Sequence, residues 1–487
     1  MERARRLALS QLACLGRHTM TGVICTSGRQ FEDWSGDYKL FSKNRFDREK
    51  IFAAVRSEAL CHLGDDGDVV CAMDDSLMRK KGRKIPGTGN VRDPLSPPFH
   101  ANLAWGLRFV QTSMIIPPKE KAGPARAVPV DFTNAPLPKK PRKNSPPEKW
   151  RLYWRLREQF NLSRLGARRI GKMRAALDSD ERTAGRRLLM AVDNKFTNKK
   201  VFRNLPERTV LVGRLRHDAS LYHLPVTEDQ PNGKGRKKSY GQRVPTPEEI
   251  RRDDSIPWQR VPVFAAGKTH NFKVKVVSPL LWRPAGADKP LMLVVIAPLS
   301  YRPSRKSQIL YRRPAYLACT DPDMEVQKVI QAYVWRWEIE VNFRDEKQLV
   351  GLGEAQVWND NSVENDPAFV AAAYAILLLA GLKAFPACLS ADETGQDIYL
   401  EPPKWRKKDK PRLSTQDLIN QLRCELWGKA IGYERVWEGE NAEGMKNTEA
   451  RRTEENNFNG FSKDVAPFKK PKKLNPNLLS AVLYATG

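Results

Sequence analysis

The sequence predicts an α/β protein that begins in helices, continues into a buried sheet and carries a β-rich segment near its middle. Three observations lead to this prediction. Apolar residues recur at helical spacing in roughly the first 60 residues. Short continuous apolar runs then end in polar residues, as in strands that are buried on both faces. Alternating runs such as FKVKVV and LMLVVIAPL follow, and they are typical of strands with one exposed face.

The N-terminal helical region is predicted over residues 1–64. RARRLALSQLACLG and DREKIFAAVRSEALCHLG both carry apolar residues at helical spacing, and HTMTGVICTSG with a polar loop lies between them. Two roles fit this region equally. One is a basic helical module that places a helix in a DNA groove, and the other is a helical cap that packs on the next domain.

Strand-like runs begin after Gly67. DVVCAM is a short apolar run that stops at Asp74, and LLMAV is a second that stops at Asp193. NLAWGLRFVQTSMII indicates one long strand or a hairpin, and TVLVGRLR indicates a further strand. Residues 117–150 hold nine prolines, eight lysines or arginines and three acids, a composition that favours an extended linker or surface arm.

The rest of the chain alternates between helical and β-rich segments. Residues 148–176 are predicted to be helical, 217–323 β-rich, and 324–350 one long helix. The uncharged run from Pro367 to Leu382 is shorter than the roughly 20 residues that span a bilayer. We therefore expect a buried helix and no membrane anchor. The segment after Ala391 is charged and holds one expected helix, TQDLINQLRCELWG.

Charge restricts the class of partner. Lysine and arginine total 84 against 56 aspartates and glutamates in 487 residues, so the formal net charge is +28. Such an excess indicates a polyanionic partner, and nucleic acid is the expected one. The 40% hydrophobic content excludes a wholly disordered tail or a collagen-like repeat. Seven cysteines without a CxxC pair indicate reduced thiols in a cytoplasmic protein.

Two acids end the strand-like runs, Asp74 and Asp193. Catalytic groups in open sheets gather at the carboxyl ends of parallel strands, so these acids would lie close together if the strands are neighbours. Two close carboxylates repel each other unless a cation neutralises them, and oxygen-only ligands suit Mg²⁺ or Mn²⁺. For either residue alone, a turn-capping aspartate explains the pattern better.

The predicted helix 324–350 adds a third acid. Its residues Tyr333, Arg336, Glu340 and Lys347 are spaced by three, four and seven positions, which places them within an arc of roughly 60° on a helix. The face thus carries an acid with two cations and a phenol, a set suited to a metal and its neighbouring phosphates. A solvated charged face is the alternative, but the segment is rich in tryptophan and other large apolar residues.

These motifs resemble the DDE transposases of bacterial insertion sequences, in the branch whose third acid lies in a Tyr-x2-Arg-x3-Glu-x6-Lys motif. That motif reads YVWRWEIEVNFRDEK here. The first acid matches the family's Asp-Asp-Ser/Thr with a following Lys-Gly in MDDSLMRKKG, and the second matches Asp-x-x-Phe/Tyr-Thr-Asn in DNKFTN. The acids are 119 and 147 residues apart, and the longer interval fits the β-strand insertion of this branch.

The resemblance implies an RNase H-like fold, a mixed five-stranded sheet flanked by helices with an inserted β-rich subdomain. It divides the chain into a helical DNA-binding region, a catalytic domain in two parts around the insertion, and a charged region for DNA or dimer contacts. In order, these are residues 1–64, 65–216 with the basic arm 117–150, 217–323 as the insertion, 324–390 and 391–487.

The resemblance also implies a chemistry and its partners. Two Mg²⁺ ions, which Mn²⁺ can replace, would be held by Asp74, Asp193 and Glu340. Phosphates near the scissile bond would be contacted by Tyr333, Arg336 and Lys347. A homodimer would bind the inverted-repeat ends of a mobile element, cleave them and join the 3′-OH ends to target DNA, at the nucleoid in a bacterial cytoplasm.

Several alternatives stay open. Asp75 is the rival of Asp74, which is preferred because it directly follows the apolar run. Trp258 and Trp282 in the insertion are candidates for stacking on a flipped base, and core packing is the simpler role for both. An RNase H-like nuclease without strand transfer, or a domesticated DNA-binding protein, would carry the same motifs.

Overall fold

A computed structural model describes residues 2–43, 45, 47–93, 102–118, 124–226, 238–302, 304, 307–385 and 412–427. The chain divides into two compact units, Met1–Ala375 and Ile376–Gly487. Most of the C-terminal region expected over 391–487 lies outside the described residues. The exception is helix α12 (Thr415–Trp427), which confirms the helix predicted for that segment.

Helices form the start of the chain, as expected. They are α1 (Glu2–Ala13), α2 (Met20–Thr26), α3 (Ser35–Ser42) and α4 (Arg48–Leu60). Asp47 caps α4, because its side chain accepts hydrogen bonds from the backbone N–H groups of Glu49 and Lys50. Leu7 of α1 and Phe41 of α3 pack with Phe369 in one apolar cluster. This cluster ties the N-terminal helices to the distant helix α11 (Asp360–Ala384), within the first unit.

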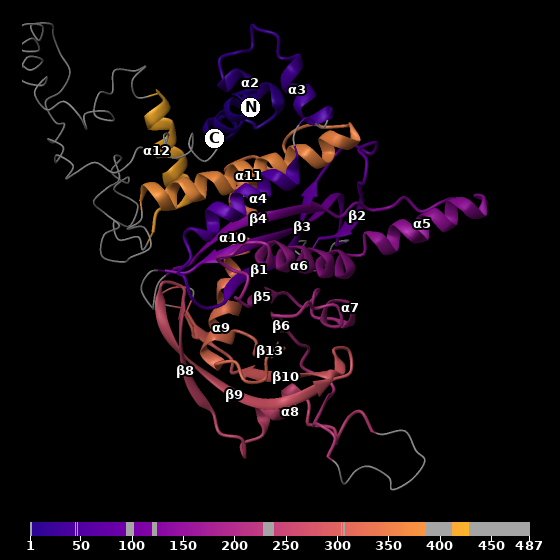
Figure 1. The fold of residues 1–487 in the computed structure, drawn as a ribbon, viewed down its shortest axis with the longest axis vertical. Coiled ribbons are helices and arrows are strands. Elements are labelled where there is room, and N and C mark those ends of the chain that lie inside the picture. Colours follow the sequence, from indigo (N-terminus) through magenta and orange to yellow (C-terminus); the bar gives the residue numbers. More distant parts are fainter. Residues whose placement is uncertain are drawn as a thin grey trace, which may run out of the picture. The chain divides into compact units, whose positions relative to one another are not determined.

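Five strands form the centre of the sheet in the order β4–β3–β1–β5–β6. β1 (Val69–Arg79), β5 (Leu188–Val192) and β6 (Thr209–Arg214) run parallel, whereas β3 (Leu103–Ile116) is antiparallel to both β1 and β4. The short β2 (Gly89–Arg92) also pairs with β3. Figure 1 shows the strands in this order. This mixed sheet with flanking helices is consistent with an RNase H-like fold.

The predicted linker over 117–150 is wrong in its middle. Residues Arg126–Asn134 form strand β4, which is almost entirely buried and pairs with β3. Averaging over the proline-rich surroundings hid the apolar stretch AVPVDF. Pro129 is tolerated because it lies where the register with β3 shifts, and proline occurs in sheets at edges and bulges.

Helices cover both faces of this sheet. The expected helix over 148–176 is two helices, α5 (Pro147–Gln159) and α6 (Leu162–Asp178). Asn161 separates them and caps α6 through its side chain. Gly166 of α6 packs against Met73 of β1, so α6 lies on the face of β1 opposite to Asp74, because successive strand residues alternate in direction. The short α7 (Lys199–Phe202) follows β5.

Residues 217–323, predicted as a β-rich insertion, hold several strands, and most of these strands belong to the central sheet. They extend the central sheet through the antiparallel pair β6–β13, giving eleven strands in all. The insertion comprises β7 (Leu221–Tyr222), α8 (Pro247–Arg252), β8 (Gln259–Ala265), β9 (Lys268–Trp282), β10 (Gly286–Ile296), β11 (Ser300–Tyr301), β12 (Leu310–Tyr311) and β13 (Ala315–Cys319), of which β11 and β12 pair separately.

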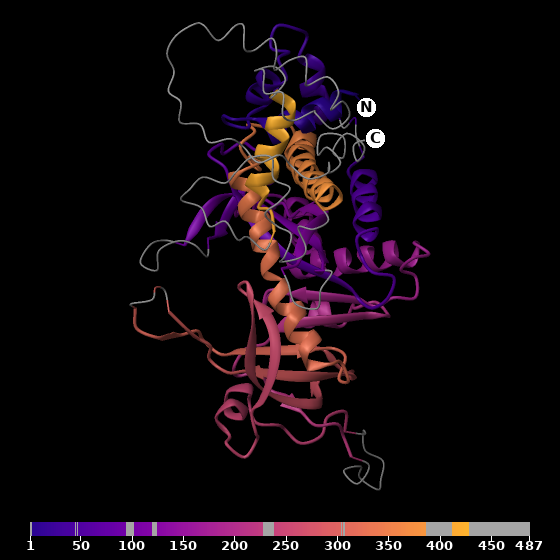
Figure 2. The same cartoon turned by 90° about the vertical axis from the view of Figure 1, so that its left-hand side faces the viewer.

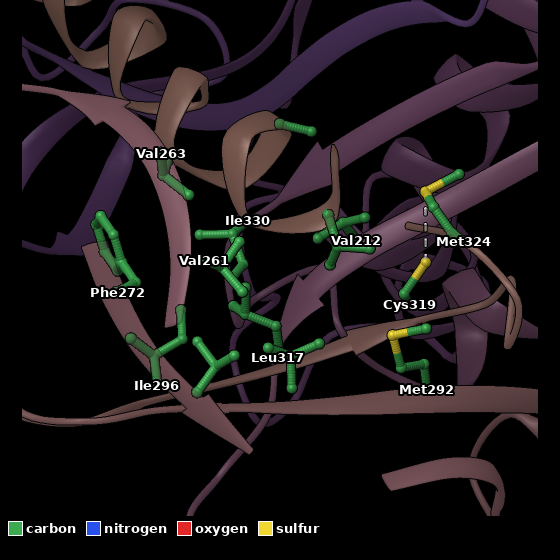
Figure 3. Packing of buried hydrophobic residues seen from close by; sticks show 14 of the residues in the cluster. Val212, Val261, Val263, Phe272, Met292, Ile296, Leu317, Cys319, Met324 and Ile330 are labelled. Carbon is green, nitrogen blue, oxygen red and sulfur yellow. Dashed lines mark hydrogen bonds between the residues drawn. The ribbon is translucent and has the colours of Figure 1, made fainter. Parts of the chain in front are cut away.

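The helix expected over 324–350 is two helices that meet at Arg336. They are α9 (Val326–Trp335) and α10 (Trp337–Gln348), and Arg336 itself keeps helical angles of φ −52° and ψ −30°. The two run on from one another (Figure 2). Ile330 of α9 packs with Val261, Phe272 and other insertion residues (Figure 3). This core fixes α9, and α10 after it, against the sheet.

Helix α11 begins at Asp360, seven positions before the expected start at Pro367, which lies inside it. By length and composition it is the one helix of the described residues that could cross a membrane. In the structure, 89% of its most apolar 18-residue window is buried. That burial is the environment expected for the core helix of a globular domain.

Candidate active site

The first two predicted acids lie at the ends of neighbouring parallel strands. β1 and β5 pair in register up to Met73 and Val192, and Asp74 and Asp193 are the next residues of the two strands. The condition set by the sequence, that these strands be neighbours, is therefore met. The strands differ in one respect: β1 continues as strand to Arg79, whereas β5 ends and the chain turns, with Thr197 donating from its hydroxyl to the Asp193 carbonyl.

Asp74 is a buried carboxyl in a crowded electrostatic environment. It is 5% exposed, and burial raises its pKa to about 7. The Arg336 guanidinium opposes this rise, whereas the Asp75 and Asp193 carboxylates add to it. The influence of Asp193 on Asp74 follows from the parallel register. The Asp74 and Asp193 carboxylates thus repel each other, and a positive charge between them would relieve that repulsion.

Arg336 supplies a positive charge between two of the acids. Its Nη1 lies 2.9 Å from Asp74 Oδ2 and 3.8 Å from Glu340 Oε1. The remaining acid, Asp193, also raises the pKa of Arg336 through its negative charge. Tyr333 stacks under the guanidinium, with 5.4 Å from its ring centre to the Arg336 Cζ atom. Arg336 is thus the centre around which the structure gathers the predicted residues.

Lys347 also points from α10 towards β1. Its Nζ donates to Ser76 Oγ at 2.5 Å and lies 6.0 Å and 5.8 Å from the ring centres of Phe109 and Phe343. Burial lowers the pKa of its ammonium group. In this structure Lys347 therefore holds α10 against β1, two residues beyond Asp74, rather than extending into solvent.

Asp74 and Asp75 point to opposite faces of the sheet, because successive side chains of a strand alternate. Asp74 and Ser76 share the face of α10, where they meet Arg336 and Lys347 respectively. Asp75 instead lies 3.0 Å from Lys195 Nζ and 3.4 Å from Arg108 Nε. Arg336 therefore links Asp74, and not its rival Asp75, to Glu340.

The sequence interpretation missed the polar groups that support this site. Lys195 lies inside the DNKFTN motif and links the turn after Asp193 to Asp75. Glu346, one position before Lys347, is fully buried, and burial raises its pKa to about 8. Asn342 joins α10 to Ser113 of β3 at 2.9 Å and to the Ala127 carbonyl of β4 at 3.1 Å. A single polar residue within an apolar strand, such as Arg108, was the sequence signal that could have indicated these supporting groups.

The acids have the chemistry of a cation site but not a closed cage. Carboxylate oxygens are the ligands that Mg²⁺ and Mn²⁺ prefer, and the buried Asp74 beside Asp193 lacks only a stronger counter-charge. Across the described part of the chain, however, no group of three or more histidine, cysteine, aspartate or glutamate side chains could hold a metal ion as they stand. Arg336 lies where it neutralises Asp74 and Glu340 instead. The oxygen donors are of a type that suits a divalent ion, but in the described structure Asp74 is paired with Arg336 and the acids do not form a metal site.

The two insertion tryptophans are both packed against other side chains. Trp258 lies 4.6 Å from the ammonium of Lys275, measured to the ring centre. Lys275 is fully buried and donates to the carbonyls of Ile250, Arg251 and Asp253. Trp282 packs edge-on against Phe202 at 5.2 Å between ring centres. Both contacts agree with the simpler of the two roles considered for these residues.

Comparison with known proteins gives one family match. Residues 1–270 match the family described as DDE superfamily endonuclease (DDE_5). The match covers more than half of the chain and includes Asp74 and Asp193, whereas Glu340 lies beyond it. No curated protein matches the chain.

Proposed function

Because this chain belongs to the DDE superfamily endonucleases, we propose that it is a DNA transposase. It would bind the inverted-repeat ends of a mobile element, cleave them and join the resulting 3′-OH ends to target DNA. The family membership supports a nuclease or transposase acting on DNA, and strand transfer is the finer step of the proposal. The Tyr-Arg-Glu-Lys signature is the reason for choosing transposition.

One observation carries the proposal. Asp74 follows the strand segment paired in parallel with β5, which Asp193 follows in turn, and Arg336, 262 positions from Asp74 in the sequence, contacts both Asp74 and Glu340. Asp74 and Asp193 thus lie on neighbouring strands, and Glu340 is linked to Asp74 through Arg336, although the three acids are far apart in the sequence. Acids that can hold cations, beside basic groups that can bind phosphate, are what phosphoryl transfer uses.

Each residue has a role in the proposed reaction. Asp74, Asp193 and Glu340 would hold two Mg²⁺ or Mn²⁺ ions. When bound, these ions supply charge neutralisation at the attacking and leaving oxygens of the phosphodiester. Arg336, once released from Asp74, is placed to pair with a DNA phosphate, which guanidinium groups bind with good geometry. Tyr333 orients the Arg336 guanidinium from below, and Lys347 adds positive charge at β1 beside Ser76.

The partners follow from the same reaction. Joining two element ends to one target requires two active sites, so we propose a homodimer in the synaptic complex with both DNA ends. The net charge of +28 supports binding of DNA. The work would take place at the nucleoid of a bacterial cytoplasm, where element and target DNA are accessible.

A strand-transfer assay tests the proposal. The DNA that flanks the gene is searched for matched inverted repeats, and a duplex ending in that repeat with a free 3′-OH is mixed with a target plasmid and Mg²⁺. The purified chain should join the end to the plasmid, and Asp193→Asn should not. Hydrolysis without joining would identify a metal-dependent nuclease instead. Duplex binding without either reaction would identify a DNA-binding protein that has lost catalysis.

A further inference from the structure

A basic surface lies on α5 and on the chain that leads into it. We define the α5 surface as residues 139–143 (Lys-Lys-Pro-Arg-Lys) together with Lys149, Arg151, Arg155 and Arg157. All eight lysines and arginines of this surface are exposed. Between Lys139 and Arg157 the chain has a single acid, Glu148. The surface is therefore strongly positive in itself, and not only as part of a basic protein.

Among the described residues, the ion pairs that anchor this helix to the rest of the chain lie at its C-terminal end. α5 has no buried residue and extends away from the strands (Figure 1). Its C-terminal end is anchored through Glu158, which pairs with Lys200 at 2.9 Å and also with Arg164. A helix with this composition gains little from core burial, and most helical stability in proteins comes from packing of that kind. Its exposed residues are therefore free to serve recognition.

Aromatic side chains join the arm to the helix. Trp150, Tyr153 and Trp154 contact one another, with ring centres 5.1 to 6.5 Å apart. Lys140 of the arm lies 6.0 Å from the centre of the Trp150 ring, and Arg157 lies 5.1 Å from that of Trp154. These cation–π contacts place charges of the arm and of the helix beside one another.

Most of the positive charges on the α5 surface have no acidic partner. Among the described residues, Arg151 forms the one ion pair of this surface, with Glu148 at 3.6 Å between two side chains that are each 77% exposed. An exposed pair of this kind contributes little energy and is easily exchanged for another anion. Exposed cations without acidic partners can bind the phosphates of a polyanion without first losing another contact.

The anchored end of α5 leads back to the acids. Ser163, just beyond α5, accepts a hydrogen bond from the Asn198 side chain at 2.9 Å. Asn198 belongs to the turn that follows Asp193, and Lys195 of the same turn contacts Asp75. Lys195 and Lys199 are exposed along this turn. Basic residues thus continue from the strand end that carries Asp193 to the base of α5.

We propose that the α5 surface binds the sugar-phosphate backbone of double-stranded DNA, as a contact outside the active site that holds the duplex whose phosphate is cleaved. The inference rests on the proposed function for the identity of the duplex. It does not require that the chain join DNA ends. Backbone contacts of this kind position a duplex without reading its sequence.

The test measures binding of a 40-bp duplex of mixed sequence at several NaCl concentrations, without divalent ions. The variant replaces Lys149, Arg151 and Arg155 by alanine. The matched control replaces Arg260, Lys268 and Lys273, which are also exposed and remove the same charge from β8 and β9. Each lost phosphate contact should lower the slope of log K against log salt by about 0.9. We expect the α5 variant to lose about two units or more of slope and at least tenfold in affinity, and the control to lose less than one unit.

Two results would overturn the inference. In the first, the α5 variant and the control have the same slope and affinity. In the second, the α5 variant keeps its DNA slope but changes the state of association measured by sedimentation, which would make α5 an interface between copies of this chain. Neither result depends on cleavage. A protein that fails to cleave or join DNA but shows the expected loss of slope would refute the proposed function and leave this inference standing.

Discussion

Helices α5 and α10 have similar residue types but differ in burial and in the partners of their charged side chains. Both carry tryptophan, arginine, lysine and glutamate in 13 and 12 residues respectively. On α10 and at the Arg336 position before it, the cations have defined partners in Asp74 and Ser76, and five residues are buried. On α5 no residue is buried, and the cations meet solvent. Composition therefore does not distinguish a catalytic helix from a recognition helix, whereas the partners of the charges do.

The largest effect should come from the three acids of the candidate active site, one of which lies on α10. Replacing Asp74 or Asp193 by asparagine, or Glu340 by glutamine, should lower plasmid cleavage about a thousandfold or more, because each change removes a charge from the site of phosphoryl transfer. DNA binding should persist. Cleavage is followed by plasmid nicking with Mg²⁺, and binding by gel shift. Asp75→Asn serves as the comparison for Asp74→Asn, and equal nicking by the Asp74 variant and the native chain would exclude Asp74 from the site.

A stability loss should follow from removing Arg336. The side chains of Arg336 and Asp74 are 11% and 7% exposed, so Arg336→Ala leaves a buried carboxylate without its partner. Loss of one member of a buried pair costs about 3 kcal/mol of unfolding free energy. Urea denaturation without divalent ions measures this.

The same variant tests whether the guanidinium stands in for a cation. Mg²⁺ should raise the melting temperature of Arg336→Ala more than that of the native chain, because the acids no longer have a competing charge. The double variant with Asp74→Asn serves as the control and should respond less than Arg336→Ala alone. Equal shifts in the native chain and in the single variant would mean that Arg336 does not compete with the ion.

A smaller effect concerns Glu346, a fully buried residue of α10. Its pKa is about 8 in the folded chain, against about 4.3 for an unperturbed glutamate. The folded state therefore keeps a proton that the unfolded chain has released between these values, and the free energy of unfolding falls as the pH rises through this window. Glu346→Gln removes this dependence and should be the more stable form at pH 8.

The measurement for Glu346 is the difference between variant and native stability at pH 5 and at pH 8. Other buried acids such as Asp366, whose pKa burial raises to about 6, contribute equally to both proteins and cancel. The gap should widen with pH. A gap that stays constant would mean that Glu346 is already ionised in the folded chain.

The smallest effect should be found on α5. Replacing Lys149, Arg151 and Arg155 by alanine should change the free energy of unfolding by less than about 0.5 kcal/mol, because exposed side chains without partners contribute little. A loss of more than 1 kcal/mol on α5, measured in urea, would show that the helix packs on something and would narrow the contrast between the two helices.

Much of this arrangement was accessible from periodicity and local chemistry. The apolar runs before Asp74 and Asp193 are strands, as predicted, whereas their pairing as parallel neighbours was only a condition of the sequence argument and comes from the structure. The motif residues Tyr333, Arg336, Glu340 and Lys347 do lie along one helical segment. Strand β4 was missed because prolines on both sides masked a short apolar run. The length of β1 was underestimated. The polar pair Asp74 and Asp75 suggested that the strand ends there, but β1 continues to pair with β3 as far as Arg79.

The sequence alone determined which residues could carry charge, which segments had to be buried and how far apart along the chain the three acids stand. Tertiary structure alone decided that Arg336 lies between Asp74 and Glu340, that Lys195 and Arg108 take Asp75, and that the insertion extends the central sheet. The reason is physical. Periodicity reports the burial of one element at a time, whereas the partner of a charge depends on which distant elements pack together, and no local pattern encodes that.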